Sequence, residues 1–159
     1  MLLLGEFEHT IDSKNRLAVP ADIRDVLLSQ GSMAGLIATP GSNGSLWLWP
    51  ETTFEVLAAE LGGSLLGDEN MVDFERAIFS QSARCPLDSA GRVRLPERLL
   101  ARFGLSGSVM VLGVRDHLEL MTPLDWRAAQ DALPSDREIW QRARKATGAP
   151  GAGPGEVPS

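Results

Sequence analysis

The sequence predicts an α+β fold made of two units, each with the element order β-β-α-β-β-α. Three observations support this prediction. The nine letters DSKNRLAVP at 12–20 return as DSAGRVRLP at 88–96, 76 positions later. Each copy follows a short strand-like run and precedes a segment that a proline opens as a helix. The chain has 159 residues, 43% of them hydrophobic, which is enough to bury a core.

The two copies agree position by position when Asp12 is aligned with Asp88. The matched pairs are Ile11/Leu87, Asp12/Asp88, Ser13/Ser89, Arg16/Arg92, Leu17/Val93, Val19/Leu95 and Pro20/Pro96. The runs before the motif, 5–11 and 82–87, are typical of short strands. The runs after it, 16–19 and 92–95, alternate with the period of two that half-buried strands show. Two short strands around a polar turn predict a hairpin in each copy.

The residues of the turn fit this interpretation. Asp12 and Asp88 can accept hydrogen bonds from backbone N–H groups two residues further on. The fourth turn position holds Asn15 in one copy and Gly91 in the other, the two residue types that best tolerate positive φ. One backbone conformation therefore accounts for both copies, and Asp12, Asp88 and Gly91 are interpreted as structural turn residues.

The remaining elements follow from proline, glycine and hydrophobic periodicity. Helices are predicted over 20–30 and 96–105, ended by Gly31 and Gly104. Closing helices are predicted to start near Pro50 and Pro123. An amphipathic segment at 68–79 is expected to form a helix between the units. Further strand pairs are predicted at 36–40 with 46–49 and at 108–114 with 117–120.

These elements divide the chain into four segments. Residues 1–62 form the first unit and 80–132 the second. Residues 63–79 link them and include the amphipathic helix. Residues 133–159 are expected to hold a C-terminal helix remnant and a Pro/Gly-rich tail whose composition favours disorder.

Charge is distributed unevenly along the chain, whose net charge is −6. Residues 51–75 contain seven acidic residues and no Lys or Arg, whereas residues 84–102 contain five Arg against two acidic residues. Local fields depend on this distribution more than on the total. The sequence therefore permits a basic face on an acidic molecule, and the acidic run is interpreted as a solvated helix face.

Composition argues against several classes of protein. Cys85 is the only cysteine and His9 and His117 the only histidines, in a spacing that resembles no metal site, so no metal and no cofactor are expected. We find no nucleophile and base pair and no phosphate loop, so no catalytic residue, small-molecule substrate or enzyme activity is expected. No apolar run is long enough to span a membrane, and the start lacks the pattern of a signal peptide. We expect a cytoplasmic protein.

Two copies of Asp-x-x-x-Arg with Pro four residues later, the second within FSQSARCPLDSAGRVRLP, resemble the MraZ family of bacterial transcriptional regulators. The resemblance extends from about Leu4 to Arg127. It implies a tandem double swapped-hairpin β-barrel of the AbrB type (SpoVT-AbrB domains) with flanking helices, in which hairpins from two units interleave. It also implies a nucleoid-associated homo-oligomeric ring that binds short direct repeats in promoter DNA, upstream of the operon for division and cell-wall genes.

The candidate DNA contacts lie just past the turns, because an arginine there stands on the rim of a hairpin and a two-stranded ribbon fits the major groove. Arginine can read guanine with two hydrogen bonds, and lysine more readily meets phosphate. Arg16 and Lys14 are favoured because the second copy has Ala90 in place of the lysine. Arg92 and Arg94 are secondary candidates. Asn15, where the family usually has Gly, lies at the same rim.

Alternatives remain at this stage. An Asp four residues before an Arg can be only a turn-stabilising ion pair, and for Arg92 this interpretation is favoured over DNA contact. The chain could also be an AbrB-like antitoxin-type interaction module that binds DNA weakly. That class is expected to have one hairpin unit and a long partner-binding tail, whereas this sequence has two units and a short tail. Trp47 and Trp49 are expected to place one indole outward, which favours a subunit interface over base stacking.

Overall fold

The computed structural model describes residues 1–31, 35–62 and 68–148. The chain forms two compact units, Met1–Pro123 and the part from Leu124 onward. The first unit holds the β-sheet and the two copies of the repeat.

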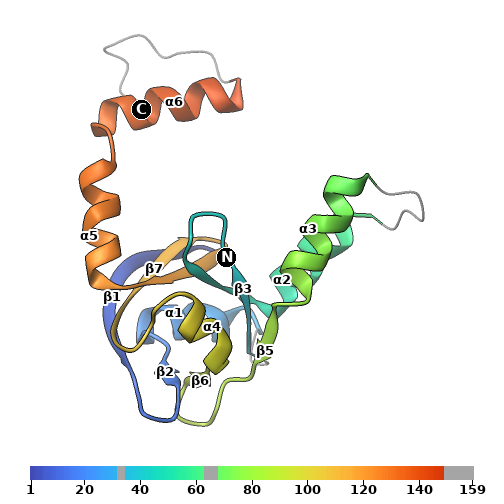
Figure 1. Cartoon of the computed structure of the whole chain (residues 1–159). Helices are drawn as coiled ribbons and strands as arrows, with labels where there is room; N and C mark the ends of the chain where they lie inside the picture. The colour runs from blue at the N-terminus through green and yellow to red at the C-terminus, as the bar shows by residue number, and fades with distance from the viewer. Residues whose placement is uncertain (32–34, 63–67, 149–159) are drawn as a thin grey trace. The chain divides into compact units, whose positions relative to one another are not determined.

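The described part of the first unit contains one antiparallel sheet of eight strands. The strands run in the order β5-β3-β4-β8-β7-β1-β2-β6, and a bridge between Leu87 and Val93 joins the two ends of this order. The sheet is therefore a nearly closed barrel (Figure 1). Its strands are β1 (Leu3–Ile11), β2 (Arg16–Ala18), β3 (Leu36–Pro40), β4 (Leu46–Pro50), β5 (Ala83–Cys85), β6 (Arg92–Arg94), β7 (Gly107–Arg115) and β8 (His117–Met121).

Strands from the two copies of the repeat interleave. The first strand of each copy pairs with the third strand of the other, as β1 with β7 and β3 with β5. The second strands pair with each other, β2 with β6, and so do the fourth strands, β4 with β8. This exchange is the swapped-hairpin arrangement, and the predicted α+β fold with an AbrB-like barrel is confirmed.

The first strands of the two copies, β1 and β5, differ in length although the repeat would make them alike. β1 starts at Leu3, two residues before the predicted start, and pairs with β7 over nine residues from Leu3 to Ile11. β5 spans only Ala83–Cys85 and pairs with three residues of β3. Strand length here follows the length of the available partner, because an unpaired backbone segment gains no ladder hydrogen bonds.

Four helices occur in the described part of the first unit. They are α1 (Ala21–Ser29), α2 (Glu51–Glu60), α3 (Glu69–Phe79) and α4 (Glu97–Arg102). Pro20 and Pro96 are the N-caps of α1 and α4, so these helices begin one residue later than predicted, and Pro50 is the N-cap of α2. The Asp68 carboxylate caps α3 by accepting a hydrogen bond from the backbone N–H of Asn70.

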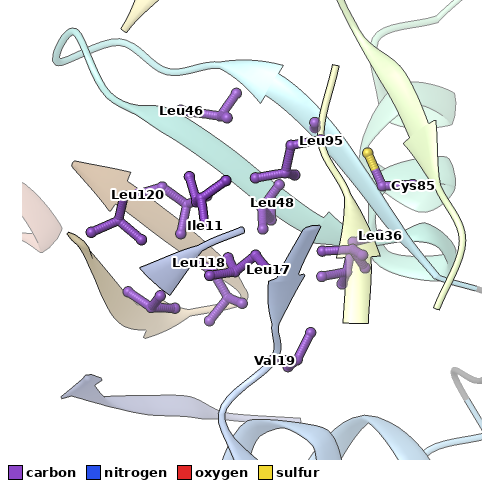
Figure 2. Packing of buried hydrophobic residues seen from close by; sticks show 14 of the residues in the cluster. Ile11, Leu17, Val19, Leu36, Leu46, Leu48, Cys85, Leu95, Leu118 and Leu120 are labelled. Atoms are coloured by element: carbon purple, nitrogen blue, oxygen red, sulfur yellow. The ribbon is translucent and has the colours of Figure 1, made fainter. Parts of the chain in front are cut away.

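The core lies inside the barrel (Figure 2) and includes buried side chains of α1 and α4. Leu17 in the middle of β2 and Val93 in the middle of β6 are almost completely buried, with 1% and 0% of their surface exposed. Because side chains alternate between the faces of a strand, burial of these two residues directs their neighbours outward. The core thereby fixes which way Arg16, Arg92 and Arg94 face.

The second unit consists of α5 (Pro123–Ala132) and α6 (Asp136–Thr147) as far as it is described. Ser135 caps α6 by accepting a hydrogen bond from the Glu138 N–H, and Arg142 pairs with Glu138 one turn later at 2.6 Å. The tail at 149–159, predicted to be disordered, lies outside the described residues. The division of the sequence into segments 1–62, 63–79, 80–132 and 133–159 stays a prediction.

Candidate nucleic-acid interface

The first turn, residues 12–16, is built around the side chain of Asp12. Its Oδ1 accepts hydrogen bonds from the backbone N–H groups of Lys14 and Arg16, both at 2.9 Å. Its Oδ2 accepts one from Nε of Arg16 at 2.7 Å. The backbone N–H of Asn15 donates to the Asp12 carbonyl, and Asn15 has a φ of +61°. One carboxylate thus closes the turn and orients the arginine that follows it.

The second turn, residues 88–92, repeats this geometry. Oδ1 of Asp88 accepts from the N–H groups of Ala90 and Arg92, both at 2.9 Å, and Oδ2 accepts from Nε of Arg92 at 2.9 Å. Gly91 has a φ of +75°. The left-handed backbone at the fourth position explains why Asn and Gly occupy it, since most other residues are strained there.

The two carboxylates are held in their ionised form. Hydrogen bonds from the backbone and side chain of Arg16 lower the pKa of Asp12, against a smaller opposing effect of burial. Arg92 lowers the pKa of Asp88 in the same way. Both turns therefore contain an ion pair at neutral pH.

The two turns are joined into one surface by the pairing of β2 with β6. The backbone N–H of Val19 donates to the carbonyl of Gly91, and that of Leu95 donates to the carbonyl of Asn15. β2 and β6 lie side by side, and the loops that precede them lie at the same end of the barrel (Figure 1). The structure thus brings together turn residues that are 76 positions apart in the sequence.

Three arginines share the outer face of this strand pair. Arg16 is the direct partner of Arg94, and Ala18 is the direct partner of Arg92. Residues directly opposite each other on antiparallel strands project from the same face, so these side chains form one cluster, which we call the basic ribbon (Arg16, Arg92 and Arg94 on β2 and β6). Lys14, on the first turn beside the basic ribbon, is exposed, and so is Arg94 within the ribbon.

One cation beside the second turn was missed by the sequence analysis. Arg24 of α1 lies over Gly91, so close that a Cβ at Gly91 would lie 2.7 Å from its Nη1 and 2.9 Å from its Cδ. No motif points to Arg24, because it precedes the second turn by more than sixty positions and is brought there by the tertiary fold. The one sequence feature that could have indicated a neighbour here is the glycine at position 91, because the absence of a Cβ leaves room for a side chain from another element.

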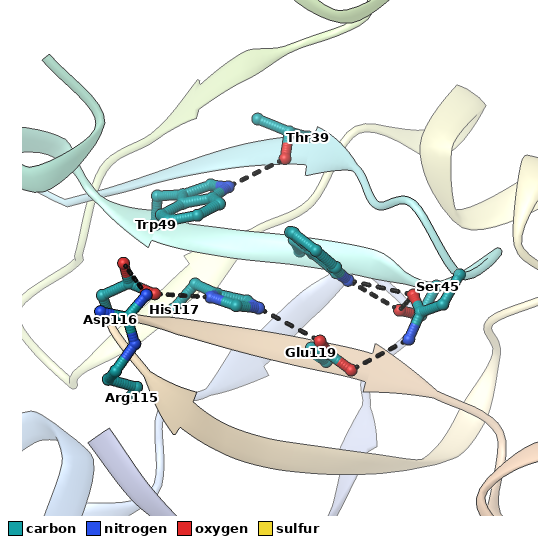
Figure 3. A network of polar contacts seen from close by, with 9 residues as sticks. Thr39, Ser45, Trp49, Arg115, Asp116, His117 and Glu119 are labelled. Carbon is teal, nitrogen blue, oxygen red and sulfur yellow. Dashed lines mark hydrogen bonds and ion pairs between the residues drawn. The ribbon is translucent and has the colours of Figure 1, made fainter. Parts of the chain in front are cut away.

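A second polar cluster lies on the outer face of β4 and β8 (Figure 3). The His117 imidazole stacks on Trp47 and Trp49, with ring centroids 4.2 and 4.6 Å apart. Its Nδ1 and Nε2 lie 2.9 Å from Asp116 and 3.1 Å from Glu119. Burial lowers the pKa of His117, but the hydrogen bonds to these two carboxylates outweigh it and leave the pKa raised.

The tryptophans of this cluster correct an expectation from the sequence. Trp47 and Trp49 are two residues apart on β4, so both project from its outer face while Leu46 and Leu48 fill the core. Their indole N–H groups donate to Ser45 and Thr39, at 2.9 and 3.0 Å. The expectation that only one of the two faces outward was wrong, because residues at i and i+2 of a strand share a face.

An apolar groove of about 520 Å³ lies between the β3–β4 hairpin and helices α2 and α3. Trp47 and Trp49 form part of its floor, and Phe54, Leu61 and Phe74 are among its walls. Phe74 and Leu61 are 45% and 39% exposed. The linking helix predicted at 68–79 therefore presents apolar side chains at the surface rather than in the barrel core.

His9 and Cys85, which nothing in the sequence places in a metal or catalytic site, lie within strands. His9 lies in β1 and contacts the Ala18 carbonyl through Nδ1 at 2.8 Å. Cys85 lies in β5, and burial raises the pKa of its thiol to about 11, so it is a poor nucleophile. In residues 1–31, 35–62 and 68–148, no group of His, Cys, Asp and Glu could hold a metal ion. Within the same residues no helix is long and apolar enough to cross a membrane.

Comparison with known proteins gives a consistent result. A family model described as "MraZ protein, putative antitoxin-like" matches residues 2–74 and 78–146. A protein of Roseiflexus sp. (strain RS-1) named "Transcriptional regulator MraZ" is 32% identical over 139 residues, which cover 87% of this chain and 94% of the relative. Relatives with the same name in Thermomicrobium roseum and Limosilactobacillus reuteri (strain DSM 20016) are 32% and 33% identical, over 85% and 79% of this chain and 92% and 84% of their own lengths.

Proposed function

Because this chain belongs to the MraZ family, we propose that it regulates transcription by binding DNA sequence-specifically through the two hairpin turns and the basic ribbon. The relatives carry the name of a transcriptional regulator and not of an enzyme, in agreement with the expectation from the sequence. The proposed target is a set of short direct repeats in the promoter upstream of the division and cell-wall operon.

The observation that supports this proposal best is the pairing of β2 with β6. It places Arg16, Arg92 and Arg94 on one outer face of a two-stranded ribbon. Ribbons of two strands have the width to enter the major groove, where each base pair presents a distinct pattern of donors and acceptors. The net charge of −6 is compatible with DNA binding at this cluster, since the acidic residues of 51–75 lie on other elements.

Within the ribbon, Arg16 is the proposed reading residue. Asp12 contacts it through Nε, and within the described residues no hydrogen bond or ion pair involves its Nη1 or Nη2. Those nitrogens are the donors with which arginine reads O6 and N7 of guanine. The ion pair with Asp12 and the proposed DNA contact are therefore compatible. The carboxylate orients the guanidinium in advance, which reduces the entropy lost on binding.

The other candidates have supporting roles in this proposal. Lys14 is exposed at the tip of the first turn, where we propose that it meets phosphate. Asn15 holds the left-handed backbone beside it and lies close to the DNA. Arg92 and Arg94 extend the same positive surface from the second copy. Asp12, Asp88 and Gly91 shape the turns.

We propose that the apolar groove holds a second copy of this chain in a homo-oligomeric ring. The helices beside the groove are acidic, whereas Arg142, Arg144 and Lys145 of α6 are basic and Trp140 on the same helix is 66% exposed. A neighbouring copy can thus supply apolar and complementary charged side chains together. A ring would present several ribbons to several DNA repeats, and linked contacts raise affinity without new chemistry.

The proposal is tested by fluorescence anisotropy with a labelled duplex from the region upstream of the protein's own operon and a shuffled duplex of the same composition. Wild type, Arg16→Ala and the control Arg76→Ala are compared over a KCl series, and light scattering gives the mass of each. Arg76 is an exposed arginine of α3. We expect a multi-chain mass for all three proteins, and for wild type and the control a preference for the native duplex. Arg16→Ala should lose about 1–3 kcal/mol of that preference.

Equal binding of both duplexes by wild type would contradict sequence-specific recognition. It would favour the second candidate, an antitoxin-type interaction module with weak DNA binding, which the description of the family model also suggests. Unchanged preference in Arg16→Ala would leave the first turn with a purely structural role. A mass of one chain would overturn the ring.

A further inference from the structure

Arg24 lies beside the second turn, whose third position holds Ala90 where the first turn has Lys14. Its side chain covers Gly91, with the Cβ position of that glycine 2.7 Å from Nη1. It also lines a surface depression of about 450 Å³ together with Asp88, Ser89 and Ala90 of the turn. The side chain is half-buried, which is consistent with a stem that packs on the turn and a guanidinium at the surface.

The first turn has a basic residue at its third position, in addition to the arginine that both turns share. Lys14 occupies the third position, and the equivalent residue of the second turn is Ala90. Arg24 comes from outside the second turn, on α1. Its own equivalent in the second copy is Leu100, which is buried in the core and 5% exposed. The two copies therefore differ at both pairs of positions, Lys14/Ala90 and Arg24/Leu100. The second turn is where both differences matter, because it has no lysine and Arg24 lies beside it.

The charge of Arg24 is not neutralised by a neighbour in the described structure. Asp88, the carboxylate of the turn, accepts hydrogen bonds from Nε of Arg92 and from two backbone N–H groups. Within the described residues no carboxylate forms an ion pair with Arg24, although Asp22 and Asp25 lie on the same helix and face solvent. Arg24 therefore adds a positive charge beside a turn that is itself close to neutral.

We propose that Arg24 is the phosphate contact of the second turn and takes the place that Lys14 has in the first turn. The ligand is a phosphodiester group of the DNA backbone, which one guanidinium can bind with two hydrogen bonds. Both ends of the basic ribbon would then hold the DNA backbone while the arginines between them face the groove. The inference rests on the proposed function, because it assumes that the ribbon binds DNA.

The test compares Arg24→Met, which keeps most of the apolar stem and removes the charge, with Arg24→Lys and with the control Arg76→Met. Binding of the native duplex is measured by anisotropy over a KCl series, and thermal unfolding is followed for each variant. For Arg24→Met we expect a slope of log K against log[KCl] that is reduced by about 1 for each subunit in contact with DNA. The preference for native over shuffled duplex should remain. Arg24→Lys and Arg76→Met should keep the wild-type slope.

Two further variants separate a phosphate contact from a packing role. Adding Ala90→Lys to Arg24→Met puts a lysine where the first turn has Lys14, and it should restore the slope even if Arg24→Met lowers the melting temperature. Gly91→Asn keeps a residue type suited to positive φ but displaces the Arg24 side chain, so it should reduce the slope without any change at position 24.

The result that overturns the inference is an unchanged slope in Arg24→Met, or no recovery on adding Ala90→Lys. In either case Arg24 only packs on the turn. Failure of the proposed function gives a different pattern, because wild type itself would then show no preference for the native duplex and Arg16→Ala would have no effect.

Discussion

The first and second turns make the same hydrogen bonds but carry different side chains. In each turn an aspartate accepts from two backbone N–H groups and from the Nε of an arginine, with distances that agree within 0.2 Å. The third position is Lys14 in one turn and Ala90 in the other. The fourth position is Asn15 or Gly91. The backbone is thus duplicated, and the charged surface is not.

The difference follows from what each position does. The aspartate closes the turn and the fourth residue must adopt positive φ, so few residue types serve there. The third residue only donates its backbone N–H to the aspartate, which any residue except proline can do. Its side chain is therefore free to differ between the copies, and at the second turn Arg24 of α1 lies over the neighbouring Gly91. We interpret the first turn as the reading turn and the second as a supporting one.

Removing the aspartates tests whether the turns are structurally equivalent, and the largest effect on stability is expected here. Asp12→Ala and Asp88→Ala each lose three hydrogen bonds and an ion pair, so both should lower the melting temperature by several degrees and by similar amounts. Thermal unfolding followed by circular dichroism measures this. A large decrease of the melting temperature in one variant and none in the other would show that the two turns contribute differently to stability despite their shared geometry.

The same pair of variants has an expected pH dependence. The pKa of both carboxyls is lowered from 3.8 in the folded protein, so their stabilisation is present above that pH and is lost as the pH falls through the folded pKa. Wild type should lose stability more steeply than either variant below about pH 4. Parallel curves for wild type and variants in acid would contradict the ionised pairs.

A smaller effect is expected at the fourth turn position, where the two residues differ. Gly91→Ala places a side chain at a φ of +75° and against Arg24, which should cost about 1–2 kcal/mol in the free energy of unfolding. Asn15→Ala should cost less, because the wild type already places a residue with a side chain in this region. Urea unfolding of both variants measures the difference. A larger loss in Asn15→Ala would reverse this ranking of the turns.

The smallest effect is expected for Asn15→Gly, which makes the first turn resemble the second. Glycine adopts a φ of +61° without strain but is freer in the unfolded chain, so the free energy of unfolding should stay within about 0.5 kcal/mol of wild type. DNA affinity should also change little if Asn15 serves the backbone. Loss of preference for the native duplex in this variant would instead give the Asn15 side chain a part in recognition.

Much of this structure could be predicted because the relevant signals are local. The alternation around Leu17 and Val93, the prolines before α1 and α4 and the turn residues at 12 and 88 all act within a few positions of themselves. The expectation for Trp47 and Trp49 was wrong, because residues two apart on a strand project from the same face. The repeat also predicted similar lengths for β1 and β5, although their partners differ in extent.

In the candidate site, too, local features follow from the sequence and contacts between distant segments do not. Sequence alone determined the two turns, the residues that shape them and the arginines that follow, since a duplicated motif specifies a local backbone twice. Only the tertiary structure decided that β2 pairs with β6, so that Arg16 meets Arg94 on one face, and that Arg24 comes to lie over Gly91. The physical reason is that pairing between distant strands and the docking of a helix depend on burial of the whole core, which no short stretch of sequence contains.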